Sequence, residues 1–217
     1  MVNIAHKRSI IKWWCVGLLR AFHIKVVTFG NLPPANTQGV MFVANHVSWA
    51  DIHALNSLIP LRFVAKSDIK NWPIFGYLVT KANTLFIDRS KRQQAGRIVE
   101  TVLDSLKAGD NCCYFPEGTT SDGTHMLPFK SSVLQAAISA NTHVWPVAIK
   151  YVNADGSINT EMAYAGDTSM IQSMKTVIAQ KNAVVELHFL TPMQAAGRDR
   201  RELTDAAFQA IKAKLAL

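Results

Sequence analysis

Short apolar segments rich in β-branched and aromatic residues alternate with segments of helical periodicity along this 217-residue chain. The expected strands are Val40–Ala44, Arg62–Ala65, Thr84–Ile87, Cys112–Phe115, Val144–Lys150 and Val184–Leu190. The expected helices are Ile4–Phe22, Ala50–Leu58, Ile74–Thr80, Arg92–Ala108, Ser132–Ala140, Ser169–Gln180 and Leu203–Leu217. Strands that alternate with helices favour a parallel sheet covered by helices. We therefore predict a single α/β domain with a central, mostly parallel sheet flanked by helices, preceded by an N-terminal amphipathic helix.

The composition excludes a disordered chain, because 49% of the residues are hydrophobic and only 18% are charged. The net charge of +8 is concentrated near the N-terminus, where Asp51 is the first acidic residue. Five basic residues precede it, namely Lys7, Arg8, Lys12, Arg20 and Lys25. Such a local excess indicates a local anionic partner, which is a membrane surface, a nucleic acid or an acidic substrate. The odd number of cysteines, without C-x-x-C spacing, predicts neither a disulfide framework nor a zinc site.

The expected N-terminal helix carries apolar residues at helical spacing, at Ile4, Ile11, Trp14, Cys15, Leu18 and Phe22. The chain has no run of about 20 apolar residues, which is the length that a membrane-spanning helix requires. A short helix with tryptophan and basic residues is typical of an anchor that lies in the membrane interface. A helix that packs on its own domain with a solvated basic edge has the same pattern, and both interpretations stay open.

Polar clusters follow three of the expected strands, at Asn45–Asp51, Ile87–Arg89 and Pro116–Ser121. In open α/β sheets, ligands bind where the strands end and the helices begin. In the second cluster, Arg89 can hold a phosphate bidentately or pair with Asp88. In the third, Gly118 lets the backbone approach a ligand beside Glu117, although the segment also has the composition of a polar turn.

His46 and Asp51 have the residue types of a general-base pair. A neutral imidazole accepts a proton at cellular pH, and a carboxylate on its other nitrogen fixes the tautomer and stabilises the imidazolium. Ser48-x-x-Asp51 also matches a capping box, so Asp51 has a purely structural interpretation as well. Metal binding by His46, Asp51 and His53 is a weaker alternative, because this spacing fits no common zinc pattern.

The clusters together are much more specific than each alone. N-H-x-S-x-x-D, F-I-D-R, F-P-E-G-T-x-S and a V-x-P-V-x-I strand follow one another in this order. This combination resembles the glycerolipid acyltransferase family, membrane-associated enzymes that acylate lysophosphatidic acid and related lysolipids. The resemblance extends from about Val40 to Lys150, and its H-x4-D signature is His46 to Asp51.

The resemblance implies a role for each matching residue. His46 is expected to be the general base that deprotonates the acceptor hydroxyl, and Asp51 is expected to orient it. The expected substrate-binding residues, which would hold the glycerol-phosphate or equivalent head group, are Lys66, Arg89, Glu117, Gly118 and Thr119. The acyl donor is expected to be acyl-CoA or acyl-carrier protein, with no metal and no further cofactor.

The expected activity is O-acylation of 1-acyl-glycerol-3-phosphate to phosphatidic acid, with lyso-ornithine lipid or another lysophospholipid as alternative acceptors. Residues 1–25 would form the amphipathic segment and residues 26–217 the acyltransferase domain. Because the N-terminal portion has one amphipathic segment and no expected spanning helix, we expect peripheral binding, at the cytoplasmic face of the membrane. A non-catalytic membrane-surface binding module is the competing class of protein. A nucleic-acid partner is not expected, because the charge outside the first 50 residues is near balance and no nucleic-acid motif occurs.

Overall fold

The computed structural model describes residues 4–67, 84–87 and 94–217. Within these residues, eight strands form one sheet in the order β1-β7-β6-β2-β5-β3-β4, and β8 also pairs with β6. The strands are β1 Ile24–Gly30, β2 Met41–Ala44, β3 Arg62–Lys66, β4 Leu85–Ile87, β5 Cys112–Tyr114, β6 His143–Val152, β7 Ala183–Phe189 and β8 Met193–Gln194. Strands β2 to β6 run parallel to one another, whereas β7 is antiparallel to β6 and carries β1 parallel to itself. The prediction of a mostly parallel sheet is confirmed.

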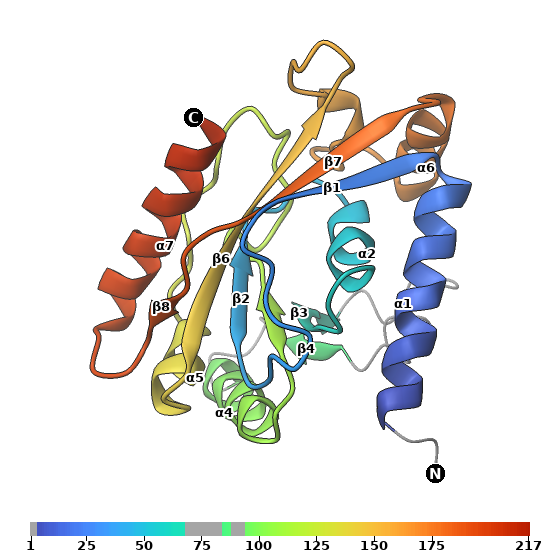
Figure 1. Ribbon diagram of the computed structural model, residues 1–217. Coiled ribbons are helices and arrows are strands. Elements are labelled where there is room, and N and C mark those ends of the chain that lie inside the picture. The colour runs from blue at the N-terminus through green and yellow to red at the C-terminus, as the bar shows by residue number, and fades with distance from the viewer. Residues whose placement is uncertain (1–3, 68–83, 88–93) are drawn as a thin grey trace.

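Helices cover both faces of this sheet (Figure 1). The helices in the described part of the chain are α1 Ile4–Ala21, α2 Ala50–Asn56, α4 Gln94–Lys107, α5 Leu134–Ser139, α6 Met170–Ala179 and α7 Arg200–Leu215, with a 3₁₀ turn η2 at Thr160–Met162. Strand β2 shows why both faces are covered. Its side chains alternate, so Phe42 and Ala44 pack with α1, α2 and α6, while Met41 and Val43 pack with α4, α5 and α7.

Strands β1 and β8 and the turn η2 are absent from the elements expected from sequence. Strand β1 lies at the edge of the sheet, and most of its side chains are only half-buried or exposed, so it lacks a continuous apolar run. Helix α7 begins three residues before its expected start, because the Asp199 carboxylate accepts hydrogen bonds from the N–H groups of Arg201 and Glu202 and caps it there. The expected helix Ile74–Thr80 lies outside the described residues. The predicted division of the chain after residue 25 stays a prediction.

Helix α1 packs against α2 and buries Cys15 and Leu19, and Phe22 is buried directly after the end of the helix. On its opposite side Trp13 is 75% accessible. Trp14, which was expected on the same apolar face as Cys15, is 44% accessible. Apolar side chains therefore lie on both sides of the helix, and the expected division into an apolar and a basic face is not confirmed. None of the described helices is long and apolar enough to cross a membrane.

The contact between α1 and α2 makes folding stability depend on pH. Cys15 Sγ lies 3.6 Å from Nδ1 of His53 on α2. Burial raises the pKa of the Cys15 thiol to about 12 and lowers the pKa of His53 to about 4. In the unfolded chain His53 has a pKa of about 6.5. Its contribution to stability is therefore present above this value and is lost as pH falls toward the folded pKa.

We expect the free energy of unfolding to fall by about 2–3 kcal/mol more in the wild type than in His53→Gln between about pH 7.5 and pH 4.5. Urea denaturation of both proteins at the two pH values measures this difference. Equal losses in the two proteins would contradict the prediction. Exposed His143 supplies the matched control, His143→Gln, which should keep the wild-type dependence on pH.

Candidate active site

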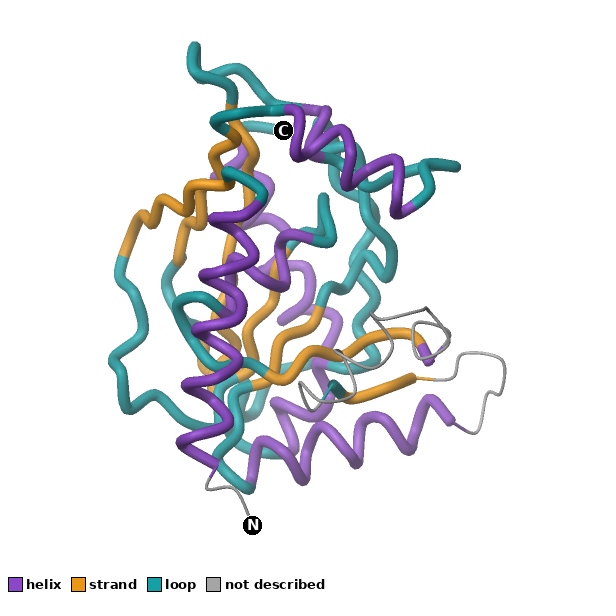
Figure 2. Tube along the Cα trace, turned by 90° about the vertical axis from the view of Figure 1, so that its right-hand side faces the viewer, coloured by secondary structure: helices purple, strands orange, loops and turns teal. Residues whose placement is uncertain are grey.

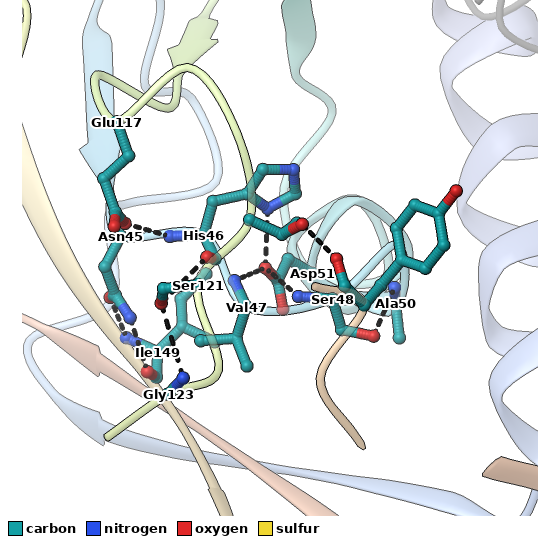
Figure 3. A network of polar contacts seen from close by, with 12 residues as sticks. Asn45, His46, Val47, Ser48, Ala50, Asp51, Glu117, Ser121, Gly123 and Ile149 are labelled. Atoms are coloured by element: carbon teal, nitrogen blue, oxygen red, sulfur yellow. Dashed lines mark hydrogen bonds and ion pairs between the residues drawn. The ribbon is translucent and has the colours of Figure 1, made fainter. Parts of the chain in front are cut away.

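His46 lies on the loop that joins the end of β2 to the start of α2, and Asp51 lies in the first turn of α2 (Figure 3). His46 Nδ1 lies 2.8 Å from Asp51 Oδ2, with the carboxylate completely buried and the imidazole partly accessible. An ionised carboxylate only accepts hydrogen bonds, so Nδ1 must be the protonated nitrogen of the neutral ring. The Nε2 atom, which points away from Asp51, is then the one able to accept a proton.

Three further donors satisfy the buried Asp51 carboxylate. Oδ2 also accepts the backbone N–H groups of Val47 at 2.8 Å and Ser48 at 3.0 Å. Oδ1 accepts the hydroxyl hydrogen of Tyr151, from β6, at 2.6 Å. Burial raises the pKa of Tyr151 well above its usual value, and the charge of Asp51 raises it further, so the hydroxyl remains a donor. These bonds hold the carboxylate in one position beside the imidazole.

The same carboxylate also bonds to the backbone just before α2, whose N-cap residue, Trp49, makes no capping hydrogen bond with its side chain. The Ser48 N–H bond to Asp51 is one half of the capping box expected from the sequence. The other half is altered, because Ser48 Oγ accepts the N–H of Ala50 at 3.4 Å and not that of Asp51. Asp51 therefore both holds the backbone before α2 and orients His46, so its structural and catalytic interpretations are compatible.

The backbone on both sides of the imidazole is tied to neighbouring strands. The Asn45 side chain donates to the carbonyl of Ile149 at 2.9 Å and accepts its N–H at 2.7 Å, which binds the end of β2 to β6. Glu117 Oε1 accepts the N–H of His46 at 2.7 Å, and Oε2 accepts the N–H of Leu127 at 2.8 Å. Because β2 and β5 are parallel neighbours, the residues that follow them meet at the same edge of the sheet.

An aromatic face fixes the plane of the imidazole. The ring of His46 stacks on Phe115 with centroids 3.9 Å apart and planes 9° apart. Phe115 stacks in turn on Phe63, which is buried on β3. Asp51 thus holds the edge of the ring and Phe115 holds its face, while the imidazole as a whole remains partly accessible.

Residues 23–150 match the model of the Acyltransferase family, and this match spans more than half of the chain. The chain belongs to the Acyltransferase family. It is 34% identical over 209 residues to the lyso-ornithine lipid O-acyltransferase of Pseudomonas aeruginosa, covering 96% of this chain and 79% of that protein. It is 35% identical over 201 residues to the 1-acyl-sn-glycerol-3-phosphate acyltransferase of Neisseria meningitidis, covering 92% and 78%.

Among solved structures, the acyltransferase resembles PlsC of Thermotoga maritima, a 1-acyl-sn-glycerophosphate acyltransferase. The TM-score is 0.74 at 21% identity, and the match covers 100% of this chain and 83% of that one. The similarity confirms the α/β fold. Family membership and the named relatives establish an acyltransferase enzyme, which answers the alternative of a non-catalytic binding module.

The structure brings together three of the residues predicted for the acyltransferase site, His46, Asp51 and Glu117. Gly118 follows at a φ of 75°, in the left-handed region that favours glycine, and Thr119 is exposed on the same loop. The side chain of Lys66 and the whole of Arg89 lie outside the described residues. His53, considered as a third metal ligand with His46 and Asp51, directs Nδ1 toward Cys15 on α1. Head-group binding by the five expected residues stays a prediction.

Sequence reasoning missed the positioning roles of Asn45 and Tyr151 and assigned Glu117 only to the substrate. Asn45 is the first residue of the recognised N-H-x-S-x-x-D motif, so its place in the motif was an available signal. Tyr151 is 100 residues from Asp51 in the chain, and only the fold brings the two together. Burial raises the pKa of Glu117, and the N–H groups of Leu127 and His46 oppose this rise.

These contacts lead to a prediction for Glu117→Gln. Glutamine keeps the size of the side chain but replaces one acceptor oxygen by NH₂, so the N–H of His46 or of Leu127 loses its partner. A hydrogen bond to a charged group contributes about 1.5–3 kcal/mol. We expect the free energy of unfolding to fall by about this amount and kcat to fall, with little change in the KM for the acceptor.

Urea denaturation and steady-state kinetics measure these quantities. Exposed Glu161, in the turn η2, supplies the control variant Glu161→Gln, which should behave as the wild type. A normal kcat with a raised KM for the acceptor would instead assign Glu117 to acceptor binding.

Proposed function

We propose that this acyltransferase moves a fatty acyl group from a thioester to the free hydroxyl of 1-acyl-glycerol-3-phosphate, which gives phosphatidic acid. The observation that carries the proposal is the His46–Asp51 pair, in which Nδ1 is committed to the buried carboxylate and Nε2 is directed away from it. The relatives named for lysolipid acceptors support this class of substrate. Acyl-CoA and acyl-carrier protein both supply the required thioester.

In the proposed mechanism, Nε2 of His46 takes the proton of the acceptor hydroxyl as the oxygen attacks the thioester carbonyl. The imidazolium keeps its Nδ1–H bond to Asp51, which stabilises the positive charge without taking the proton. The tetrahedral intermediate then collapses with cleavage of the C–S bond. The proton passes from Nε2 to the departing thiolate, so the products are the ester and a free thiol.

A phosphate head group suits the basic residues expected to bind it, Lys66 and Arg89. The register of the sheet places the backbone of Lys66 opposite Ile87, and Arg89 follows two residues later in the sequence. A guanidinium forks onto a phosphate bidentately. Lyso-ornithine lipid is the second candidate acceptor, because the relative from Pseudomonas aeruginosa carries that name.

Turnover of the two acceptors by the purified enzyme, with acyl-CoA and acyl-carrier protein each tried as donor, tests the proposal. We expect the higher kcat/KM with 1-acyl-glycerol-3-phosphate. A higher value with lyso-ornithine lipid would replace the acceptor but keep the chemistry. Absence of transfer to either lysolipid with both donors would overturn the proposed function.

A lysolipid acceptor resides in a bilayer, so we also propose peripheral binding to the cytoplasmic face of the membrane. Trp13 and Ile10, on the side of α1 that faces away from α2, are 75% and 50% accessible. Tryptophan and neighbouring basic side chains such as Lys12 suit the head-group region of a lipid surface. The variant Trp13→Ser should weaken sedimentation with vesicles while leaving the buried contacts of α1 in place.

A further inference from the structure

The outer face of α6 carries an exposed stripe of two isoleucines and one lysine. Ile171, Lys175 and Ile178 recur at the i, i+4 and i+7 positions of one helix face. Ile171 is 69% accessible and Ile178 is 48% accessible, and Lys175 between them is exposed. The opposite face of the helix buries Ser173 and Val177. We call Ile171, Lys175 and Ile178 the α6 stripe.

The α6 stripe belongs to an uneven distribution of apolar surface. Among the described residues, the exposed large apolar side chains are Ile10, Trp13 and Trp14 on α1, Ile171 and Ile178 on α6, and Phe29 and Leu32 elsewhere. Five of the seven thus lie on two helices, which stand on the same flank of the sheet in Figure 1 and face the viewer in Figure 2. Exposed apolar groups concentrated in this way mark an interaction surface.

The charge of this segment complements an anionic partner. Residues 169–182 contain Lys175 and Lys181 and no acidic residue. Apolar side chains that alternate with lysine on the outer face are typical of a helix that lies in the head-group region of a membrane. Lysine near an anionic lipid surface adds to the attraction.

Helix α6 and the residue that follows α1 both contact the loop that carries His46. Trp49, which follows Ser48, packs its ring edge-on against Phe22 after the end of α1, with centroids 5.1 Å apart. Its Nε1–H donates to Ser173 Oγ on the inner face of α6 at 3.1 Å. The N–H of Tyr164, which precedes α6, donates to the carbonyl of Val47 at 2.8 Å. A surface that bound α1 and α6 together would therefore fix the position of the His46 loop relative to itself.

We propose that the α6 stripe is a second lipid-binding surface, which docks on an anionic bilayer together with the exposed side of α1. This inference rests on the proposed lysolipid acceptor. Two points of contact define an orientation, whereas one helix alone would leave the protein free to tilt about it.

The test compares the full-length wild type with the double variant Ile171→Ser/Ile178→Ser. Binding is measured by sedimentation with vesicles of phosphatidylcholine and phosphatidylglycerol. Turnover is measured with long-chain 1-acyl-glycerol-3-phosphate in the same vesicles and with a short-chain acceptor in free solution. We expect vesicle binding to weaken about tenfold and vesicle turnover to fall with it, while the short-chain rate stays unchanged.

Two further variants serve as matched comparisons. Leu32→Ser removes an exposed apolar side chain from the loop after β1 and should leave vesicle binding unchanged. Lys175→Gln should weaken binding to anionic vesicles at low salt and lose its effect at high salt. Ile171 and Ile178 are exposed, so the double variant should keep the wild-type unfolding midpoint, which urea denaturation checks.

Unchanged vesicle binding and vesicle turnover in the double variant would overturn the inference. A raised KM for acyl-carrier protein with normal vesicle binding would overturn it in favour of a carrier-protein surface. A change in molecular mass by light scattering would overturn it in favour of a contact between two copies of the chain. The vesicle-binding measurement needs no turnover, so failure of the proposed acceptor is distinguished from failure of the α6 stripe.

Discussion

Replacement of His46 by alanine is expected to lower kcat by about 10²–10⁴-fold, the usual contribution of a positioned general base. The imidazole of His46 is partly accessible, and its carboxylate partner Asp51 is completely buried. Its removal leaves Asp51 with three donors, from Val47, Ser48 and Tyr151, so the loop should keep its conformation. Steady-state kinetics with the lysolipid acceptor, together with a circular dichroism spectrum, measure the two expectations.

The chain contains a matched control for this variant. His125 pairs with Asp122 at 3.0 Å, a distance close to that of the active-site pair, but both side chains of this second pair are exposed. His125→Ala should therefore retain the wild-type kcat. A folded His46→Ala protein with the wild-type rate would exclude His46 as the general base.

The central strands were predictable because complete burial imposes a simple pattern. All four residues of β2 are buried, so the sequence shows a continuous apolar run that ends where Asn45 and His46 begin. Parallel neighbours end at the same edge of a sheet, so the expected polar clusters after β2 and β5 indeed meet there. The part of the site that depends on this rule was therefore accessible from the sequence.

The support of the site depends on contacts that no local pattern encodes. Strand β6 was expected to end at Lys150, whereas it continues to Val152 and includes Tyr151. Side chains two residues apart share a face of a strand, so Tyr151 joins Ile149 in the core on the side of α2. Extension of the strand by one residue would have placed a tyrosine in this core, where its hydroxyl needs a partner. Only the fold identifies that partner as Asp51.

The role of Glu117 shows a second limit of prediction from the sequence. Its position beside the site followed from the strand that precedes it, but the direction of its two oxygens did not. Both accept backbone N–H groups, from His46 and Leu127, so the side chain holds two segments of the site together. The residue type alone therefore did not reveal the role of Glu117, whereas the atoms to which its two oxygens are hydrogen-bonded do.

Asp51→Asn is expected to lower kcat about as strongly as the loss of His46, with little change in the KM for the acceptor. The corresponding change in serine-protease triads costs about 10⁴-fold in kcat. In this protein Oδ2 accepts three donors and Oδ1 accepts one, the hydroxyl of Tyr151. An asparagine can keep its oxygen on the three donors and turn its NH₂ toward the Tyr151 oxygen, because a hydroxyl also accepts hydrogen bonds. The geometry is then retained, and the variant loses the negative charge that stabilises the imidazolium.

Tyr151→Phe separates this charge from the hydrogen bonds. It removes one donor to Asp51 and leaves the carboxylate ionised beside His46. A hydrogen bond to a charged group contributes about 1.5–3 kcal/mol, and only part of that differs between the ground state and the transition state. We therefore expect a loss in kcat of about tenfold or less, well below that of Asp51→Asn. Steady-state kinetics of the two variants with the same acceptor compare them directly. Equal losses would mean that Asp51 acts through the position of its oxygens alone, because the charge is present in one variant and absent in the other.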